Sequence, residues 1–310
     1  MGLKTNSIAG MEKELKINSA GFKSDTSIKE KLWVVIPVVL LVGLLSTLIY
    51  NHYTEFSIES FIAGFNQEFL IFFAIGVFAQ LVDGTLGMGY GATSTSFLLA
   101  YGVPPVVSST AVHVSEMFTT GASALSHHRF GNINKKLVKH LLIPGVLGSI
   151  IGAYLLSDVI NGDVIKPFIA VYMIILAVII IKKALKKSIV KKKTKKLGAL
   201  ALFGGFMDSV GGGGWGPIVT STLLGRGRNP RYTIGSVNAA EFAISFASGI
   251  TFMLFGGIHG WQVIIGLILG GVISAPLAAY LVNKIKRKPM MIAVGILIIL
   301  LSLKTLSKLF

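Results

Sequence analysis

Four acidic residues lie inside long apolar stretches of this sequence, where water cannot solvate their charge. They are Asp83, Glu116, Asp208 and Glu241. A carboxylate in such surroundings is energetically expensive, so we expect it to have a function. Next to an anion it would repel that anion unless it were protonated, which would couple anion movement to protons. The structural alternatives are that the two aspartates cap helices and that the two glutamates form interhelical hydrogen bonds.

A glycine-rich segment follows each aspartate: GTLGMGYG after Asp83 and SVGGGGWG after Asp208. Glycine lets the backbone turn sharply and point several N–H groups at one spot, and the start of the next helix adds a positive dipole end. This pattern favours an anion, with nearby hydroxyl groups as further donors. The alternative is that the glycines only let helices pack closely. The predicted substrate-binding residues are Gly87, Gly89, Gly91, Thr95, Ser96, Gly212, Gly214, Gly216, Thr220 and Ser221, with Thr93, Ser94 and Thr222 as further hydroxyl donors.

The two segments belong to an internal repeat with a constant offset of 125 positions. Roughly a third of the residues from Asp83 to Ile133 are identical to their counterparts. The offset also pairs His113 with Asn238, close to the two glutamates, either in the same pathway or as packed polar residues. Secondary transporters are commonly built from such repeats. The predicted coupling or gating residues are Asp83, Glu116, His113, Asp208, Glu241 and Asn238.

The elements that position these residues must be membrane helices. Of the 310 residues, 53% are hydrophobic and only 14% are charged, and a membrane crossing takes about 20 apolar residues. The sequence therefore predicts an all-α polytopic integral membrane protein. The long apolar stretches are Leu32–Tyr50, Leu137–Leu156, Val164–Ile181, Ile234–Phe255, Trp261–Val282 and Pro289–Leu306.

The basic residues predict how the chain crosses the membrane. The net charge of +16 is concentrated in short loops, which is a topology signal and explains the charge without nucleic acid. Lys182–Lys196 is cytoplasmic only if each repeat opens with a re-entrant hairpin of two short apolar pieces, and not with one broken crossing. Each repeat then has three full crossings, so the two copies lie in opposite orientations. The N-terminus is cytoplasmic, and attraction of the basic loop to anionic lipid is a secondary effect.

These boundaries divide the chain into five parts. We expect a polar cytoplasmic tail at 1–31, an extra transmembrane helix and external loop at 32–64, and repeat 1 at 65–182. A basic cytoplasmic loop at 183–196 and repeat 2 at 197–310 complete the chain.

The motifs of several other classes are missing. The sequence has no cysteine, and it shows neither HExxH, nor GxSxG, nor an ATP-binding motif. We therefore predict no enzyme, no cofactor and no metal site. A secondary transporter for a small anion fits best, and the competing functions are a passive anion channel, an intramembrane enzyme, and a membrane receptor or assembly factor.

The paired segments, the downstream glutamates and the helix sequence GVLGSIIGAYLL from Gly145 resemble the sulfite exporter TauE/SafE family of membrane permeases. The resemblance runs from about Leu70 to the end of the chain. It implies movement of sulfur-containing anions, such as sulfite or organosulfonates, across a bacterial cytoplasmic membrane. The second repeat departs from the small-residue pattern with GGVISAPLAAYL from Gly270, which predicts a different helix packing there.

Overall fold

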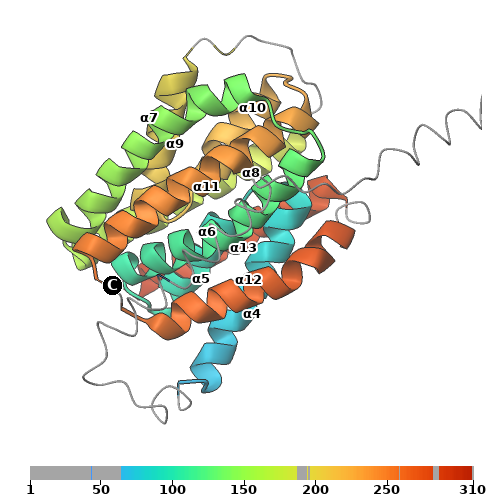
Figure 1. The fold of residues 1–310 in the computed structure, drawn as a ribbon. Coiled ribbons are helices and arrows are strands. Elements are labelled where there is room, and N and C mark those ends of the chain that lie inside the picture. Colours follow the sequence, from blue (N-terminus) through green and yellow to red (C-terminus); the bar gives the residue numbers. More distant parts are fainter. Residues whose placement is uncertain are drawn as a thin grey trace, which may run out of the picture. The chain divides into compact units, whose positions relative to one another are not determined.

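Every regular element of the described chain is helical (Figure 1), as the sequence predicted. The computed structural model describes residues 64–186, 194, 196–257, 259–281 and 286–308, together with Gly43. All the helices named below lie within one compact unit, Leu48–Phe310. The predicted tail 1–31, the extra helix Leu32–Tyr50 and most of the basic loop 183–196 lie outside the described residues.

The described helices follow the order of the repeat. The first copy contributes α4 (Gln67–Leu86), α5 (Tyr90–Tyr101), α6 (Pro105–Arg129), α7 (Lys135–Tyr154), the π-helical turn η1 (Leu155–Val159) and α8 (Gly162–Leu185). The second copy contributes α9 (Leu197–Gly211), the π-helical turn η2 (Gly216–Thr220), α10 (Ser221–Gly225), α11 (Pro230–Phe255), α12 (Trp261–Leu281) and α13 (Arg287–Ser307).

Five of the described helices are long and apolar enough to cross a membrane: α4, α7 with η1, α8, α11 and α13. One expectation is wrong here. The first repeat does not open with a short piece, because α4 has 20 residues. Its N-terminus is set by Asn66, whose side-chain oxygen accepts the Phe69 N–H at 3.1 Å, so the helix begins well before the glycine-rich segment. The counterpart α9 has 15 residues and remains short.

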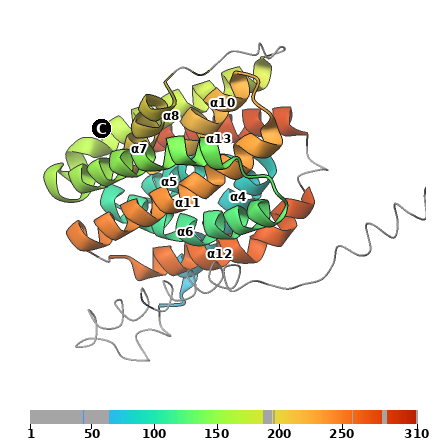
Figure 2. The same ribbon diagram turned by 45° about the horizontal axis from the view of Figure 1, so that its top comes forward.

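Helices of the two repeats pack against each other in pairs (Figures 1 and 2). α4 lies against α12, and α7 lies against α9. α4 and α9 each open a repeat, and α7 and α12 are the second long helices after the glycine-rich segments. Each opening helix therefore contacts the same element of the other repeat, so the two pairs are counterparts. α6 lies against its own counterpart α11, and α8 lies against α13.

The counterparts α6 and α11 run in opposite directions. At one end Arg231, near the start of α11, donates a hydrogen bond of 2.9 Å to the Phe130 carbonyl just beyond α6. At the other end a Cβ atom on Gly256, which follows α11, would lie 2.9 Å from the Val106 side chain at the start of α6. The loop between α6 and α7 therefore lies on the same side as the start of α11.

Glycines bring the backbones of α7 and α9 into contact. A Cβ atom on Gly148 would overlap the Leu202 carbonyl oxygen, and a Cβ atom on Gly205 would overlap the Gly145 carbonyl oxygen. Here the glycines act as close-packing residues, as is common between membrane helices. In the counterpart pair of α4 and α12, α12 carries Ala278 where α7 has a glycine. The space for the Ala278 side chain is provided by Gly84 of α4, where a Cβ atom would overlap Ala278 Cβ.

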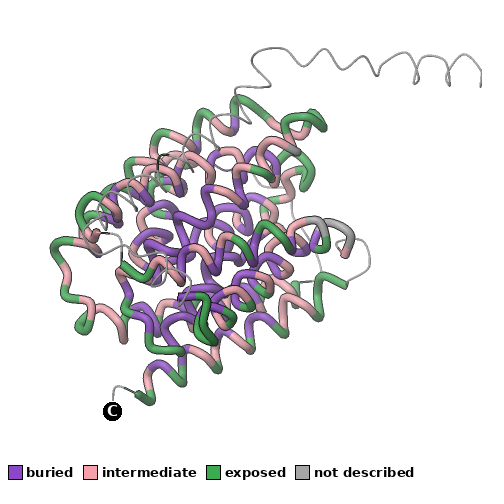
Figure 3. The backbone as a smooth tube through the Cα atoms, turned by 60° about the horizontal axis from the view of Figure 1, so that its bottom comes forward, coloured by how far each residue is buried: buried purple, intermediate pink, exposed green. Residues whose placement is uncertain are grey.

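Buried residues gather in the interior, where the helices face one another, and exposed residues lie on the outside (Figure 3). Besides large apolar residues such as Trp215 and Phe252, this interior contains many buried hydroxyl groups, a histidine and two acidic side chains. Their presence is unusual for a core that only stabilises a fold, and it places a polar centre among apolar helices.

We predict that Gly205→Ala destabilises the protein, because the added methyl group has only the backbone of Gly145 to displace. Overpacking of this kind typically costs about 1–3 kcal/mol, so the midpoint of thermal unfolding in detergent should fall. Gly198→Ala in the same helix is the matched control, since its Cβ atom would lie 3.5 Å from Pro144 Cγ, an ordinary contact. Equal midpoints for the two variants would contradict the close contact of α7 and α9.

Candidate functional site

Both glycine-rich segments break a helix in the same way. α4 ends at Gly87, which has a left-handed backbone (φ 71°) and donates its N–H to the Asp83 carbonyl at 2.6 Å. α9 ends at Gly212, also left-handed (φ 67°), and the next residue, Gly213, donates to the Asp208 carbonyl at 3.0 Å. Non-glycine residues rarely adopt this conformation. After three non-helical residues, a second helical segment begins in each repeat.

The two breaks touch each other. A Cβ atom on Gly91 would lie 2.9 Å from both the Gly212 carbonyl oxygen and Gly213 Cα, and one on Gly216 would lie 2.9 Å from Met88 Cβ. The Thr95 hydroxyl donates to the Gly212 carbonyl across this contact. Of the predicted glycines, Gly89, Gly91, Gly212 and Gly216 are thus brought together where the breaks meet, whereas Gly87 lies against Ile234 and Gly214 against Tyr172 and Asp208.

The aspartates bind the N–H groups that open the second segment of each break. Gly214 and Trp215 donate to Asp208 Oδ1 at 2.6 and 2.8 Å. In the first repeat the Tyr90 N–H donates to the Asp83 carboxylate; Tyr90 is the counterpart of Trp215. These contacts are those of a helix cap. They also mean that backbone N–H groups predicted to point at an anion are already bound to one.

The second oxygen of Asp208 faces a histidine. Asp208 Oδ2 lies 3.5 Å from His113 Nε2, and both side chains are buried. The other ring nitrogen of His113 is 2.8 Å from the Ser109 carbonyl oxygen. This carbonyl can only accept, so Nδ1 carries the proton in that contact.

Glu116 is fixed by both repeats. Its carboxylate accepts the Gly91 N–H, and Ser245 of α11 donates to its Oε2 at 3.3 Å. The latter is the interhelical hydrogen bond that the structural alternative predicted. His113, Glu116 and Asp208 each place one ligand atom within 4.8 Å of the others, although the sequence indicated no metal site.

The counterparts Glu241 and Asn238 lie differently. Glu241 is half-buried and close enough to Glu116, and then to the two aspartates, to be repelled by them. Asn238 donates to the Ser123 hydroxyl at 2.7 Å. The polar centre is therefore asymmetric, because an imidazole faces a carboxylate in one half and an amide binds a serine in the other.

Several predicted hydroxyl donors have partners inside the protein. Thr95 binds the Gly212 carbonyl, Ser96 donates to the Ala92 carbonyl at 2.7 Å, and Ser221 donates to Met88 Sδ at 3.2 Å. Thr220 is buried. In contrast, the buried hydroxyls of Thr93 and Ser94 have no hydrogen-bond partner within the described part of the chain.

The sequence did not point to three other contacts of the breaks. Tyr172 of α8 donates to the Gly213 carbonyl at 3.3 Å, Lys183 donates to the Pro217 carbonyl at 2.9 Å, and Arg287 donates to the Leu86 carbonyl at 2.6 Å. Tyr172 has a polar group within the long apolar stretch Val164–Ile181, which was a usable signal. The two cations lie at the edges of basic clusters interpreted only as topology signals.

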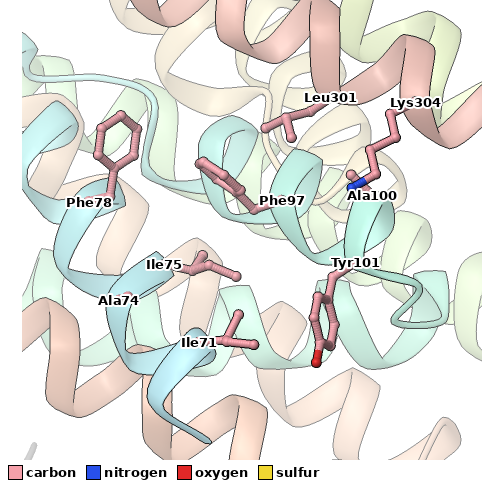
Figure 4. A pocket seen from close by; sticks show the side chains of 9 residues that line it. All are labelled: Ile71, Ala74, Ile75, Phe78, Phe97, Ala100, Tyr101, Leu301 and Lys304. Atoms are coloured by element: carbon pink, nitrogen blue, oxygen red, sulfur yellow. The ribbon is translucent and has the colours of Figure 1, made fainter. Parts of the chain in front are cut away.

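A cavity of about 560 Å³ lies elsewhere, between α4, α5 and α13 (Figure 4). Seven of its nine lining residues are apolar, and the other two are Tyr101 and Lys304. It offers few donors to orient a small anion, so the buried polar centre at the breaks is the better candidate.

The chain is similar to known proteins that are named as membrane transporters. The chain is similar to the probable membrane transporter protein YtnM of Bacillus subtilis (strain 168), with 42% identity over 250 residues, 77% of this chain and 83% of the relative. It is also similar to the probable membrane transporter protein ORF9 of a Sinorhizobium species, with 26% identity over 206 residues, 64% of this chain and 76% of that protein. Both names describe transporters and not enzymes, in agreement with the sequence. No solved structure matches the chain.

The family profile described as "Sulfite exporter TauE/SafE" matches residues 72–305. This range contains both breaks and all four carboxylates, and it confirms the resemblance seen in the sequence. The chain is a multi-pass membrane protein that belongs to the TauE/SafE sulfite exporter family.

Proposed function

We propose that the protein is a secondary transporter for a small sulfur-containing oxyanion or organosulfonate, such as sulfite. Two inverted repeats would alternate their access to the two sides of a bacterial cytoplasmic membrane, with the N-terminus in the cytoplasm. The substrate class rests on the family description, since the names of the two relatives specify transport alone.

The proposal rests on the carboxylates that are bound at the two breaks. Their N–H groups bind carboxylates, at Asp208 by two bonds of 2.6 and 2.8 Å. A backbone site that holds a carboxylate has the donors and dipole that an oxyanion needs. We propose that the substrate competes with the aspartates for these donors, and that protonation of a carboxylate releases them. Such exchange would couple anion movement to protons.

The packing of counterpart helices supports the inverted orientation. α6 and α11 are antiparallel, and the pair α4–α12 corresponds to the pair α7–α9 with the repeats exchanged. This is the arrangement expected of two copies related by an axis in the membrane plane. Each break is then contacted by helices of both repeats, so a shift of one repeat against the other changes the surroundings of the site.

Transport of labelled sulfite into proteoliposomes tests the function. We expect a saturable rate and acceleration by sulfite on the opposite side. A linear rate without such acceleration would favour a passive anion channel, and no sulfite movement would exclude this substrate.

Within that assay, Asp208→Asn should lower the rate of sulfite transport by at least about tenfold, while the protein stays folded. Asparagine can still accept the two N–H groups through its amide oxygen, but it removes the charge that protonation would switch. Asp158→Asn, at an exposed position, is the control. Wild-type rates for Asp208→Asn would show that this aspartate acts only as a cap.

Ser94→Ala should weaken sulfite binding without lowering the stability of the free protein. The buried Ser94 hydroxyl has no hydrogen-bond partner among the described residues, so its removal costs no hydrogen bond seen there, whereas a lost hydrogen bond to an anion costs about 1.5–3 kcal/mol. We expect about a tenfold loss of affinity, measured by the sulfite-dependent thermal shift. Ser115→Ala is the control, since Ser115 donates to the Ala111 carbonyl at 2.6 Å; equal sulfite affinities in the two variants would contradict the role of Ser94.

The inverted topology predicts which loops a membrane-impermeant maleimide can reach. The natural chain has no cysteine, so single substitutions report without background. Asp158→Cys and His259→Cys should be labelled on intact cells, whereas Arg129→Cys and Arg226→Cys should react only after lysis. Labelling of Arg226→Cys on intact cells would overturn the orientation of the second repeat.

A further inference from the structure

Two buried polar atoms at the centre of the molecule face each other, and neither has a hydrogen bond to any residue that the structure describes. They are His113 Nε2 and Asp208 Oδ2, which are 3.5 Å apart. Their side chains are 0% and 2% exposed. Leaving such atoms unpaired is costly. They are satisfied either by an ion pair, if His113 is protonated, or by a ligand that binds both.

The His113 imidazole and the Asp208 carboxylate are each held in place through their other polar atom. His113 Nδ1 binds the Ser109 carbonyl, so in the neutral imidazole it is Nε2 that carries the lone pair. Asp208 Oδ1 accepts two backbone N–H groups, and among the described residues Oδ2 accepts no hydrogen bond. Ligands of metal ions are characteristically oriented by such outer contacts.

Glu116 supplies the third ligand atom. One oxygen of each carboxylate and the imidazole nitrogen all lie within 4.8 Å of one another. In tetrahedral coordination at about 2.0–2.1 Å, two ligand atoms are about 3.3–3.4 Å apart, close to the 3.5 Å between His113 and Asp208. Glu116 completes the set by approaching from within 4.8 Å.

We propose that His113, Glu116 and Asp208 bind a divalent transition-metal cation such as Zn²⁺ or Co²⁺. Imidazole nitrogen with carboxylate oxygen selects these ions, whereas Mg²⁺ and Ca²⁺ prefer oxygen alone. The counterpart of His113 is Asn238, which donates to Ser123, so the second repeat does not reproduce this ligand set. On the proposed transport function, the cation would also offset the carboxylates beside the oxyanion.

The test is cation binding to the purified, untagged protein in detergent, measured separately from transport. We expect one Co²⁺ per chain, with a visible absorption spectrum of nitrogen and oxygen ligation, displaced by Zn²⁺ but not by Mg²⁺. X-ray absorption of the Zn²⁺-loaded wild-type protein should show one imidazole in the coordination shell. This measurement needs no variant, so it holds even where a substitution prevents folding.

Variants then assign the site. His113→Gln and Asp208→Asn should weaken Co²⁺ binding by more than about 100-fold, because even outer contacts of metal ligands typically account for 10–100-fold. His140→Gln should bind like wild type, since His140 is exposed and its ring nitrogen contacts only the Lys136 carbonyl.

Folded wild-type protein without stoichiometric Co²⁺ or Zn²⁺ binding overturns the proposal, and so does full binding in His113→Gln. Either result leaves the transport function standing if sulfite still moves. Conversely, a bound cation in a protein that does not transport sulfite would support the metal site while removing the proposed substrate.

Discussion

The contact between the two broken helices is the constraint on which the polar centre depends. Backbone approaches backbone where Gly91 lies against Gly212 and Gly213, and a side chain at any of these positions would separate the two segments. Because the breaks meet, His113 of the first repeat can face Asp208 of the second. Without this contact the carboxylates would lie in separate halves of the molecule.

The membrane explains why this centre is built from carboxylates and N–H groups. In hydrocarbon an unwound backbone needs partners for its polar groups, and the aspartates supply them at both breaks. A carboxylate, in turn, needs donors to compensate for its lost hydration. Each group thus satisfies the other, so the same interaction that caps a helix also creates a place where an anion is bound.

Much of this arrangement could be predicted from the sequence, because repeats and glycine clusters are local signals. The offset identified both breaks and all four carboxylates, and the named apolar stretches predicted α7, α8, α11, α12 and α13, whereas α4 and α6 lie outside those stretches. The length of α4 was misjudged, since the two repeats were assumed to open alike. The proximity of His113 to Asp208 could not be predicted, because it depends on how α6 packs against the other repeat. For the same reason the sequence did not reveal that Thr95 and Ser221 bind groups of the opposite break.

The antiparallel pairing of α6 with α11 has an energetic consequence. In a protein of two identical inverted copies, the conformations open to either side would be related by the two-fold axis between the copies. They would therefore have equal free energies. The copies here are not identical: His113 replaces Asn238, and α4 is longer than α9. If the two copies alternate their access as proposed, any resting preference for one side of the membrane must arise from residues that differ between the copies, and these include His113 and Asn238.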